Sequence, residues 1–527
     1  MNPSRAPSRA LKAVDFIVSR IGRYERWLLA AVLVFAALRF ARHARRNFWF
    51  DEIFTFYISR LGNIDLILEA TPPDGNPPLY YLLASLCLRL LGESEWATRL
   101  PSFAGFTFSM FGVYVFVRRR CSALPALFAL FVLGTAAVRQ HGIDARPYAL
   151  VLGFTMLALL CWQIAAERRS HRLAALVGMG VGIAGAIASH HFGVFQVGIP
   201  LAAGELWRLY RHRRLDLPLY AAGTAGASML LLTVPFALRT QDLLLSHVRS
   251  STVFYGQPGL SQVGSYHMMV DLRLGAIFIF LMLLLPRRAG PVTEKASAPA
   301  AIGSEIPGHE LAAAMAMALL VPLMMAVTWL STNYFLYRYA IGASLGVAIL
   351  MGYAAAAFGR ETRRGSVAAL LSVVGLIAVV GATDLARRFQ PPESSAPQAS
   401  PKLLEAAPTD QPIVVGSVLT YLPMWWYSPP DLRARLRYLT DLSYAVRGPD
   451  PLGELTLVGE RRFIPNKIDE YGPFLAENRA FLMLCKVTEA GACNDRTAWV
   501  KQRLVAEGYE FSPIILSADQ ILYQVSR

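Results

Sequence analysis

Long apolar runs separated by short polar segments fill the chain up to about residue 383. A helix rises about 1.5 Å per residue, so a run of about 20 residues can cross a hydrocarbon core of about 30 Å. The pattern predicts about eleven membrane-spanning helices, near residues 27–41, 100–117, 123–138, 148–166, 173–188, 194–207, 217–237, 273–285, 311–330, 339–358 and 366–383. The expected fold is therefore a polytopic α-helical membrane protein.

One apolar run differs from the others. "PPLYYLLASLCLRLLG", residues 77–92, has only about 14 apolar positions and contains Arg89. It is short for a membrane span. The combination of an apolar face and a charge instead favours a helix that lies flat in the membrane interface. The first external loop, about 42–99, is therefore expected to contain interfacial helices.

Composition supports the membrane assignment. The 527 residues are 54% hydrophobic and only 17% charged, and the mean hydropathy is +0.39. A soluble domain contains many more charges. The first 26 residues are polar and basic, with no small-residue cleavage site after the first apolar run, so that run is expected to be retained as a span.

The distribution of basic residues predicts the topology. If residues 77–92 do not span the membrane, the segments on one face of the membrane contain 22 Lys and Arg residues. On the opposite face, the loops that follow the first external loop contain only Arg139, Arg146, Arg239, Arg249 and Arg338. Basic loops stay in the cytoplasm. Residues 1–26 are thus predicted to be a cytoplasmic tail and 27–386 the membrane domain. The net charge of +15 reflects topology and contact with membrane lipids, and no nucleic-acid partner is expected.

The chain beyond the membrane domain has a different character. Residues 387–401, "RRFQPPESSAPQASP", are a predicted linker, and 402–527 a predicted extracytoplasmic α/β domain. Strand-like runs "PIVVGSV", "AFLML" and "QILYQV" accompany a helical pattern, "TAWVKQRLVAEG", that ends at a glycine. Cys485 and Cys493 flank a short segment in this domain. The sequence leaves open whether they form a disulfide.

Ionisable residues occur where the apolar pattern disfavours them. Asp51 and Glu52 lie inside the run "FWFDEIFTFY", just after the first span. With the predicted topology, several other segments bring polar groups to the same outer face, and ionisable groups at a membrane tend to mark a site. These further candidates are Asn76, Asp144, Arg146, His190, His191, Arg338 and Tyr339.

Each candidate also has a structural interpretation. The two adjacent carboxylates could belong to a solvated loop or a helix cap, and Asp144 and Arg146 could form a local ion pair. His190 and His191 could be ordinary interfacial residues, and Arg338 could extend to lipid headgroups. The flanking aromatic residues of "FWF" and "IFTFY" argue against free solvation of Asp51 and Glu52.

The motifs "FWFDE", "GNPPLYYLLASLCLRLLGESEWATRLPS", "DARPYALVL", "SHHFGVF" and a late "RY" occur in this order between about residues 27 and 345. In this arrangement the chain resembles the GT-C membrane glycosyltransferases, a set that includes protein O-mannosyltransferases, lipid A aminoarabinose transferases and the RgtA/B/C/D-like bacterial family. One position departs from the pattern, because Asn76 stands where the usual residue before the two prolines is His. That difference puts an acid, base or ligand role at position 76 in doubt.

The resemblance implies an activity: transfer of a sugar from a polyprenyl phosphate donor to an acceptor hydroxyl of a lipid, glycan or protein. The departing phosphate needs cations, for which Arg146, Arg338 and His191 are the candidates. The acceptor hydroxyl must lose a proton, and Asp51 is the candidate general base, with Glu52 orienting it or binding the acceptor. Asp144, His190, Asn76 and Tyr339 are candidate substrate-binding residues. The inverting, single-displacement course is implied by the family alone.

Other functions remain open at this stage. A transporter would also be polytopic, although its site usually lies near the midplane and is accompanied by an internal repeat, which this sequence does not show. A non-catalytic lipid- or glycan-binding relative is a further alternative. No cofactor is expected to be required, although a divalent metal is possible. The absence of an unblocked Asn-x-Ser/Thr acceptor favours a bacterial plasma (inner) membrane.

Overall fold

The computed structural model describes residues 9–167, 170–245, 259–284, 306–331, 335–362, 364–387, 410–445, 451–486, 499–516 and 520–527. The chain divides into two compact units. Unit 1 comprises Met1–Arg45, Arg99–Thr233 and Pro258–Pro391, and unit 2 comprises Arg46–Thr98, Val234–Gln257 and Pro392–Arg527. The first external loop therefore belongs to the same compact unit as the C-terminal domain, a grouping that the sequence did not predict.

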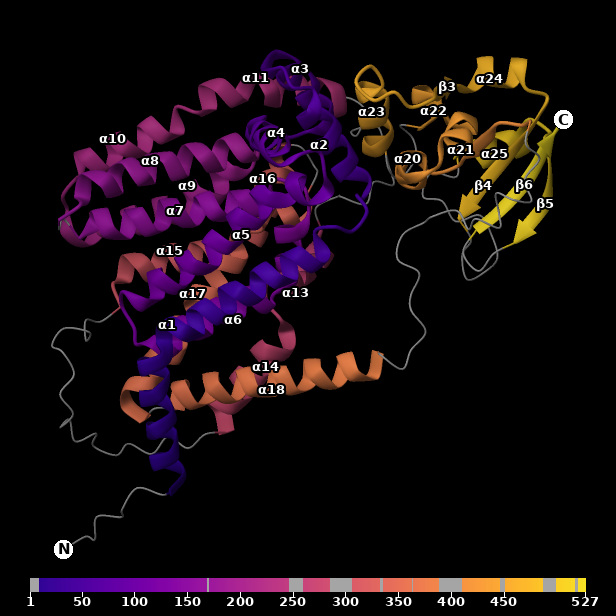
Figure 1. The fold of residues 1–527 in the computed structure, drawn as a ribbon. Helices are drawn as coiled ribbons and strands as arrows, with labels where there is room; N and C mark the ends of the chain where they lie inside the picture. The colour runs from indigo at the N-terminus through magenta and orange to yellow at the C-terminus, as the bar shows by residue number, and fades with distance from the viewer. Residues whose placement is uncertain are drawn as a thin grey trace, which may run out of the picture. The chain divides into compact units, whose positions relative to one another are not determined.

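Helices form at every apolar run predicted to span the membrane (Figure 1). They are α1 (Arg9–His43), α5 (Glu95–Arg118), α6 (Ala123–Thr135), α7 (Tyr148–Ala166), α8 (Arg172–Ser189), α9 (Gly193–His212), α10 (Leu217–Ala227), α11 (Leu230–Thr240), α14 (Leu272–Leu284), α15 (Gly308–Ala318), α16 (Leu320–Ser331), α17 (Ala343–Thr362) and α18 (Arg364–Arg387). Short helical turns connect some of them: η1 (Ala137–Ile143), η2 (Gln241–Leu245), η3 (Leu260–Ser265), α13 (Tyr266–Met269) and η4 (Tyr337–Ala340).

Several of these helices are bent or short. Within the described residues, four are long and apolar enough to cross a membrane, or up to seven if each of three bent pairs counts as one span. The number of eleven therefore stays a prediction. Helix α1 is continuous from Arg9, so the boundary predicted after residue 26 lies inside a helix.

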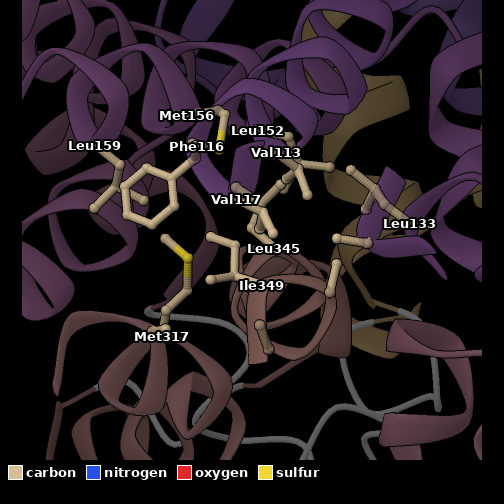
Figure 2. Packing of buried hydrophobic residues seen from close by; sticks show 14 of the residues in the cluster. Val113, Phe116, Val117, Leu133, Leu152, Met156, Leu159, Met317, Leu345 and Ile349 are labelled. Carbon is tan, nitrogen blue, oxygen red and sulfur yellow. The ribbon is translucent and has the colours of Figure 1, made fainter. Parts of the chain in front are cut away.

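The core of unit 1 forms between helices far apart in the sequence. Figure 2 shows side chains of α5, α6, α7, α15 and α17 in contact, among them Val113, Leu133, Leu152, Met317 and Leu345. All of these side chains are fully buried. Close van der Waals packing of these side chains holds the helices together, because lipid tails are themselves apolar and supply no hydrophobic driving force.

Two glycines let α5 and α7 approach closely. A Cβ atom at Gly105 would lie 2.6 Å from the carbonyl oxygen of Ala149, and one at Gly153 would lie 2.8 Å from the carbonyl oxygen of Gly105. Small residues at helix crossings permit such backbone contact. Near the same crossing, the Ser102 hydroxyl donates a hydrogen bond of 2.8 Å to the carbonyl oxygen of Arg146. These contacts fix the start of α7.

A buried polar network joins three helices of unit 1 and the turn after α5. Glu310 on α15 accepts hydrogen bonds from Arg120 Nε at 2.9 Å, from Gln163 at 2.9 Å and from the hydroxyl of Tyr353 at 2.8 Å. Glu310 is fully buried. Because both carboxylate oxygens are paired, the network satisfies the requirement for a buried charge and serves as a structural connection.

Unit 2 contains short helices around a small sheet. The helices are α2 (Phe50–Arg60), α3 (Ile64–Asp74), α4 (Leu79–Leu91), α20 (Val418–Tyr427), α21 (Pro430–Arg435), α22 (Leu442–Ala445), α23 (Pro451–Glu460), α24 (Tyr471–Glu477) and α25 (Trp499–Ala506). Helix α4 coincides with the run expected to lie in the interface and has 13 residues, too few to span a bilayer.

The sheet has six strands in the order β3-β2-β1-β4-β6-β5. The strands are β1 (Ile413–Val415), β2 (Leu436–Thr440), β3 (Ile468–Glu470), β4 (Ala480–Lys486), β5 (Glu510–Leu516) and β6 (Gln520–Ser526). β1, β2, β3 and β4 pair in parallel, whereas β6 pairs antiparallel with β4 and β5. The predicted α/β character of the C-terminal domain is confirmed. The predicted linker lies almost wholly outside the described residues.

Helices of the first external loop pack directly on helices of the C-terminal domain within unit 2. The ring of Phe56 lies 5.5 Å from that of Trp426, and the hydroxyl of Thr456 donates a hydrogen bond of 3.0 Å to the carbonyl oxygen of Pro73. The backbone N–H of Phe48 donates to the hydroxyl of Tyr427. The soluble domain thus shares a folded unit with the loop that contains Asp51.

Candidate functional site

Three segments of unit 1 meet around His190. The first runs from η1 to the start of α7, the second is the turn between α8 and α9, and the third is η4. We call Asp144, Arg146, His190, His191 and Arg338 the arginine–histidine cluster. The turn is tight, because a Cβ atom at Gly193 would lie 2.0 Å from the carbonyl oxygen of Ala186.

Aromatic rings connect the three segments. The His190 ring lies 5.5 Å from the ring of Tyr148 and 5.3 Å from that of Tyr339. Phe192 stacks on Tyr339 with centroids 4.8 Å apart. The guanidinium carbon of Arg338 lies 5.4 Å from the centre of the Tyr148 ring, a cation–π distance. The geometry therefore brings together six of the predicted residues: Asp144, Arg146, His190, His191, Arg338 and Tyr339.

His190 is a neutral group inside this cluster. Burial lowers its pKa well below the ordinary value, and His191 and the charges of Arg338 and Arg146 lower that pKa further. Its Nδ1 accepts a hydrogen bond of 3.1 Å from the backbone N–H of Phe192. Since a neutral imidazole has one proton, this hydrogen bond assigns the proton to Nε2. His190 can therefore donate a hydrogen bond without adding a charge.

Arg146 and Arg338 supply the positive charge. Arg146 is 7% exposed and Arg338 is half-buried. Guanidinium groups remain protonated at every accessible pH, and their planar N–H groups match the oxygens of a phosphate. Two permanent cations around a neutral imidazole donor form an arrangement suited to an anion.

The charge of His191 differs from the one expected, which was that of a cation. Burial lowers its pKa to about 4, so it is neutral near pH 7. Its buried Nε2 atom has no hydrogen-bond partner among the described residues. His191 can contribute to phosphate binding only as a neutral hydrogen-bonding group.

No site role was predicted for His141, which the structure places at the edge of the cluster. His141 is 5% exposed, and its Nδ1 lies 3.4 Å from the Asp144 carboxylate. The hydroxyl of Tyr337 is 3.5 Å from its Nε2, and its ring lies 5.1 Å from that of Tyr148. The signal was present in "RQHGIDARPY", where His141 precedes Asp144 by three residues, one turn of the short helix η1.

The remaining predicted residues, Asp51, Glu52 and Asn76, belong to unit 2. Asp51 lies in the first turn of α2 and is half-buried. Glu52 is 1% exposed, and its carboxylate accepts a hydrogen bond of 2.9 Å from the backbone N–H of Trp49. This is half of a capping box, so Glu52 fixes the start of the helix that bears Asp51.

Asn76 lies beside a buried acidic pair in unit 2. Its side-chain amide donates a hydrogen bond of 3.2 Å to the carbonyl oxygen of Asp74. The Asp74 carboxylate accepts a hydrogen bond from the hydroxyl of Tyr81. Burial raises the pKa of the Glu460 carboxyl well above its ordinary value, and the charge of Asp74 raises it further. Asn76 thus has a structural hydrogen bond in the turn before α4.

Within the described part of the chain, no group of three or more His, Cys, Asp or Glu side chains is arranged to hold a metal ion. The expectation that no metal is required stays a prediction. Cys485 is disulfide-bonded, and the candidate partner, Cys493, lies outside the described residues.

Comparisons with known proteins agree with this architecture. The family described as dolichyl-phosphate-mannose-protein mannosyltransferase matches residues 75–238. The structure is similar to ArnT from Cupriavidus metallidurans in the apo state, with 13% sequence identity, a TM-score of 0.52, and coverage of 94% of this chain and 97% of that chain. ArnT bound to undecaprenyl phosphate gives 15% identity and a TM-score of 0.54 with the same coverage. No curated protein sequence matches the chain.

The sequence match is confined to the middle of the membrane domain, whereas the structural similarity extends over nearly the whole chain. It includes both the helical membrane part and the C-terminal domain. The chain therefore has the GT-C fold of the membrane glycosyltransferases.

Proposed function

We propose that this protein is a glycosyltransferase of a bacterial inner membrane that moves a sugar from a polyprenyl phosphate donor to an acceptor hydroxyl outside the cytoplasm. The observation that supports this most directly is the pair Arg146 and Arg338 around the neutral, buried His190. An anionic group is the natural ligand of such a cluster. The similar ArnT structure is described as bound to undecaprenyl phosphate, a lipid with such a group.

The leaving group determines what the cluster must do. Transfer breaks the bond between the anomeric carbon and a phosphate oxygen, and that oxygen retains the electron pair. The phosphate needs no proton to depart, but its negative charge grows in the transition state. Arg146 and Arg338 can stabilise this charge, and Nε2–H of His190 can donate a hydrogen bond to the same group. Asp144, 3.4 Å from His141, can orient that imidazole.

The acceptor hydroxyl needs a base, whereas the departing phosphate needs positive charge. Its hydroxyl oxygen forms the new bond to the anomeric carbon and loses a proton, for which Asp51 is the proposed general base. Glu52 positions Asp51 through the start of α2, since its carboxylate caps the helix at Trp49. An inverting single displacement agrees with one base and one departing phosphate. These roles for Asp51 and Glu52 rest on the sequence motif.

A direct test uses the purified full-length protein in detergent with a panel of polyprenyl phosphate sugars. Release of free polyprenyl phosphate from one donor, dependent on an acceptor hydroxyl, is the expected result. The Arg146→Ala variant serves as the inactive control. Loss of donor sugar without formation of polyprenyl phosphate, or turnover that is unchanged in the variant, would contradict the proposal. Movement of intact donor across a liposome would favour the transporter instead.

A further inference from the structure

An apolar groove of about 680 Å³ runs along unit 1, away from the residues of the arginine–histidine cluster. Its walls come from α1, α5, α6, η1 and α18, and most of the lining side chains are aliphatic or aromatic. Phe40 and Phe103 stack in its wall with centroids 4.3 Å apart. Phe35, also in the lining, is 69% exposed, so the groove is open at the outer surface of the helices.

The length of the groove matches one leaflet of a bilayer. Along α1 the lining extends from Leu28 to Phe40. At a rise of about 1.5 Å per residue this is about 18 Å. Half of a hydrocarbon core of about 30 Å is about 15 Å. An extended hydrocarbon chain of one leaflet can therefore lie along the groove.

Two guanidiniums lie at one end of this lining. Arg39 near the end of α1 and Arg139 on η1 both line the groove, and their positive charges act unfavourably on each other. Nη1 of Arg139 donates hydrogen bonds to the carbonyl oxygens of Thr135 and Ala136 at the end of α6. In the described part of the chain, no carboxylate forms an ion pair with Arg39, whereas Arg139 interacts electrostatically with Asp271 and Arg273. An anion between the two guanidiniums would relieve their repulsion.

The short helix η1 separates the groove from the arginine–histidine cluster. Residues three apart lie on the same face of a 3₁₀ helix. Arg139, Gly142 and the neighbouring Ile143 line the groove. His141, in contrast, contacts Asp144 and Tyr337 of the other site. The two sites therefore use different faces of one helical turn, and the groove has its own pair of cations.

We propose that this groove binds an anionic phospholipid of the surrounding bilayer, with one acyl chain along α1 and the phosphate between Arg39 and Arg139. An anionic headgroup is favoured over a zwitterionic one, because an ammonium group close to the phosphate offsets the attraction of the guanidiniums. Apart from Thr107 and Thr135, the lining beyond the two guanidiniums is apolar, so it can hold a hydrocarbon chain. The site is independent of glycosyl transfer and of the polyprenyl phosphate donor.

Native mass spectrometry of the purified full-length protein tests this directly. The protein is titrated separately with phosphatidylglycerol, phosphatidylethanolamine and undecaprenyl phosphate, and the retained lipid is counted. We expect one phosphatidylglycerol to be retained in preference to phosphatidylethanolamine. Each basic residue near a lipid surface contributes about fivefold in affinity, so the double variant Arg39→Gln, Arg139→Gln should bind phosphatidylglycerol about 30-fold more weakly.

Two further variants keep the test decisive. Arg42→Gln removes an exposed charge of the same helix that does not line the groove, and it should bind phosphatidylglycerol normally. Ala36→Phe fills the groove with a ring and should reduce retention while the guanidiniums remain. Equal phosphatidylglycerol retention by the wild type and the double variant would overturn the proposal. Retention of undecaprenyl phosphate alone, lost in the double variant, would also overturn it and assign the groove to the prenyl lipid.

Discussion

The arginines around His190 in unit 1 and the buried carboxyls of Glu454 and Glu460 in unit 2 are groups of opposite sign, and they respond differently to burial. In unit 1, Arg146 and Arg338 surround the neutral His190. In unit 2, burial raises the pKa values of the carboxyls of Glu454 and Glu460. A carboxyl can accept a proton and become neutral when it is buried, but a guanidinium cannot lose one at accessible pH. The positive charge of Arg146 and Arg338 is therefore permanent, whereas the charge of the Glu454 and Glu460 carboxyls depends on pH.

This difference has a functional meaning. A permanent cation pair suits a ligand that is always anionic, such as a phosphodiester. A carboxylate whose protonation can change suits proton transfer. The proposed division of labour assigns the departing phosphate to Arg146 and Arg338 and the acceptor proton to Asp51. The following experiments test each side of the comparison, beginning with the largest expected effect.

The strongest test concerns Asp51. Asp51→Asn keeps the size and hydrogen-bonding capacity of the side chain but removes the ability to accept a proton, so transfer should fall by on the order of 10² to 10⁴. Donor binding and folding should persist. The measurement is the transfer rate and the donor affinity of the same purified variant. Asp65→Asn changes an exposed carboxylate at the start of α3 and should leave both quantities unchanged. Near wild-type transfer in Asp51→Asn would refute the base assignment.

The second test removes one of the two permanent positive charges near His190. Arg146→Ala or Arg338→Ala should lower transfer by about 10² to 10³, as expected when one group that stabilises transition-state charge is lost. Lys at either position keeps the charge but loses the planar fork, so Lys variants should be less impaired than Ala variants. Arg239→Ala alters an exposed arginine of α11 and is the matched control. Normal turnover in both Ala variants would exclude these residues from the site.

The third test uses the pH dependence of unit 2. Burial raises the pKa of Glu454 from the ordinary 4.5 to about 7, although hydrogen bonds from Tyr438, Thr440 and Trp499 favour the charged form. Between these pH values the unfolded chain loses the proton that the folded chain keeps, so the free energy of unfolding should fall as pH rises. Over the whole interval the loss should be on the order of 3 kcal/mol.

Hydrogen exchange of peptides around Glu454, measured in the full-length protein at pH values from 4.5 to 8 and corrected for the intrinsic exchange rate, reports this loss. Glu454→Gln cannot titrate and should reduce the slope, leaving the part that the buried Glu460 contributes. Glu477→Gln, at an exposed position of α24, should retain the wild-type slope. An unreduced slope in Glu454→Gln would show that another group is responsible.

The smallest expected effect concerns Glu460. This side chain is fully buried, and neither carboxylate oxygen has a hydrogen-bond partner among the described residues. Replacing it with Met removes an unsatisfied polar group, so Glu460→Met should raise the free energy of unfolding by about 1 to 3 kcal/mol. Thermal unfolding of the full-length protein measures the change, with Glu477→Met as the exposed control. A clear destabilisation would indicate that the Glu460 carboxyl makes a necessary contact.

Local patterns predicted much of the fold. The apolar runs became helices because a hydrophobic stretch satisfies its backbone hydrogen bonds internally in a helix. The strand-like runs became β1, β4 and β6, and "TAWVKQRLVAEG" became α25, with Gly508 beyond its end at a φ of 84°. The sequence missed β2, β3 and β5. β3 has only three residues, and β5 contains Pro513 at an irregularity in its pairing with β6. A very short strand, or a strand that contains proline, shows the alternation of apolar and polar residues only weakly.

The candidate site could be anticipated only in part. Ionisable residues in apolar surroundings pointed to Arg146, His190 and Arg338, and the structure brings these together. His141 was missed, because its role depends on the short helix η1 and on Tyr337, almost 200 residues later in the chain. The neutral state of His191 also could not be predicted, since burial sets it and burial is a property of the folded chain.

The sequence by itself determined the membrane character, the positions of the apolar helices and the chemical types of the candidate residues, because these depend on composition and short-range periodicity. Only the tertiary structure decided that the loop bearing Asp51 folds with the C-terminal domain, through contacts such as Phe56 with Trp426 and Thr456 with Pro73. Those partners are separated by more than 350 residues of chain. Their pairing depends on complementary surfaces that exist only after both segments have folded, and no local pattern encodes it.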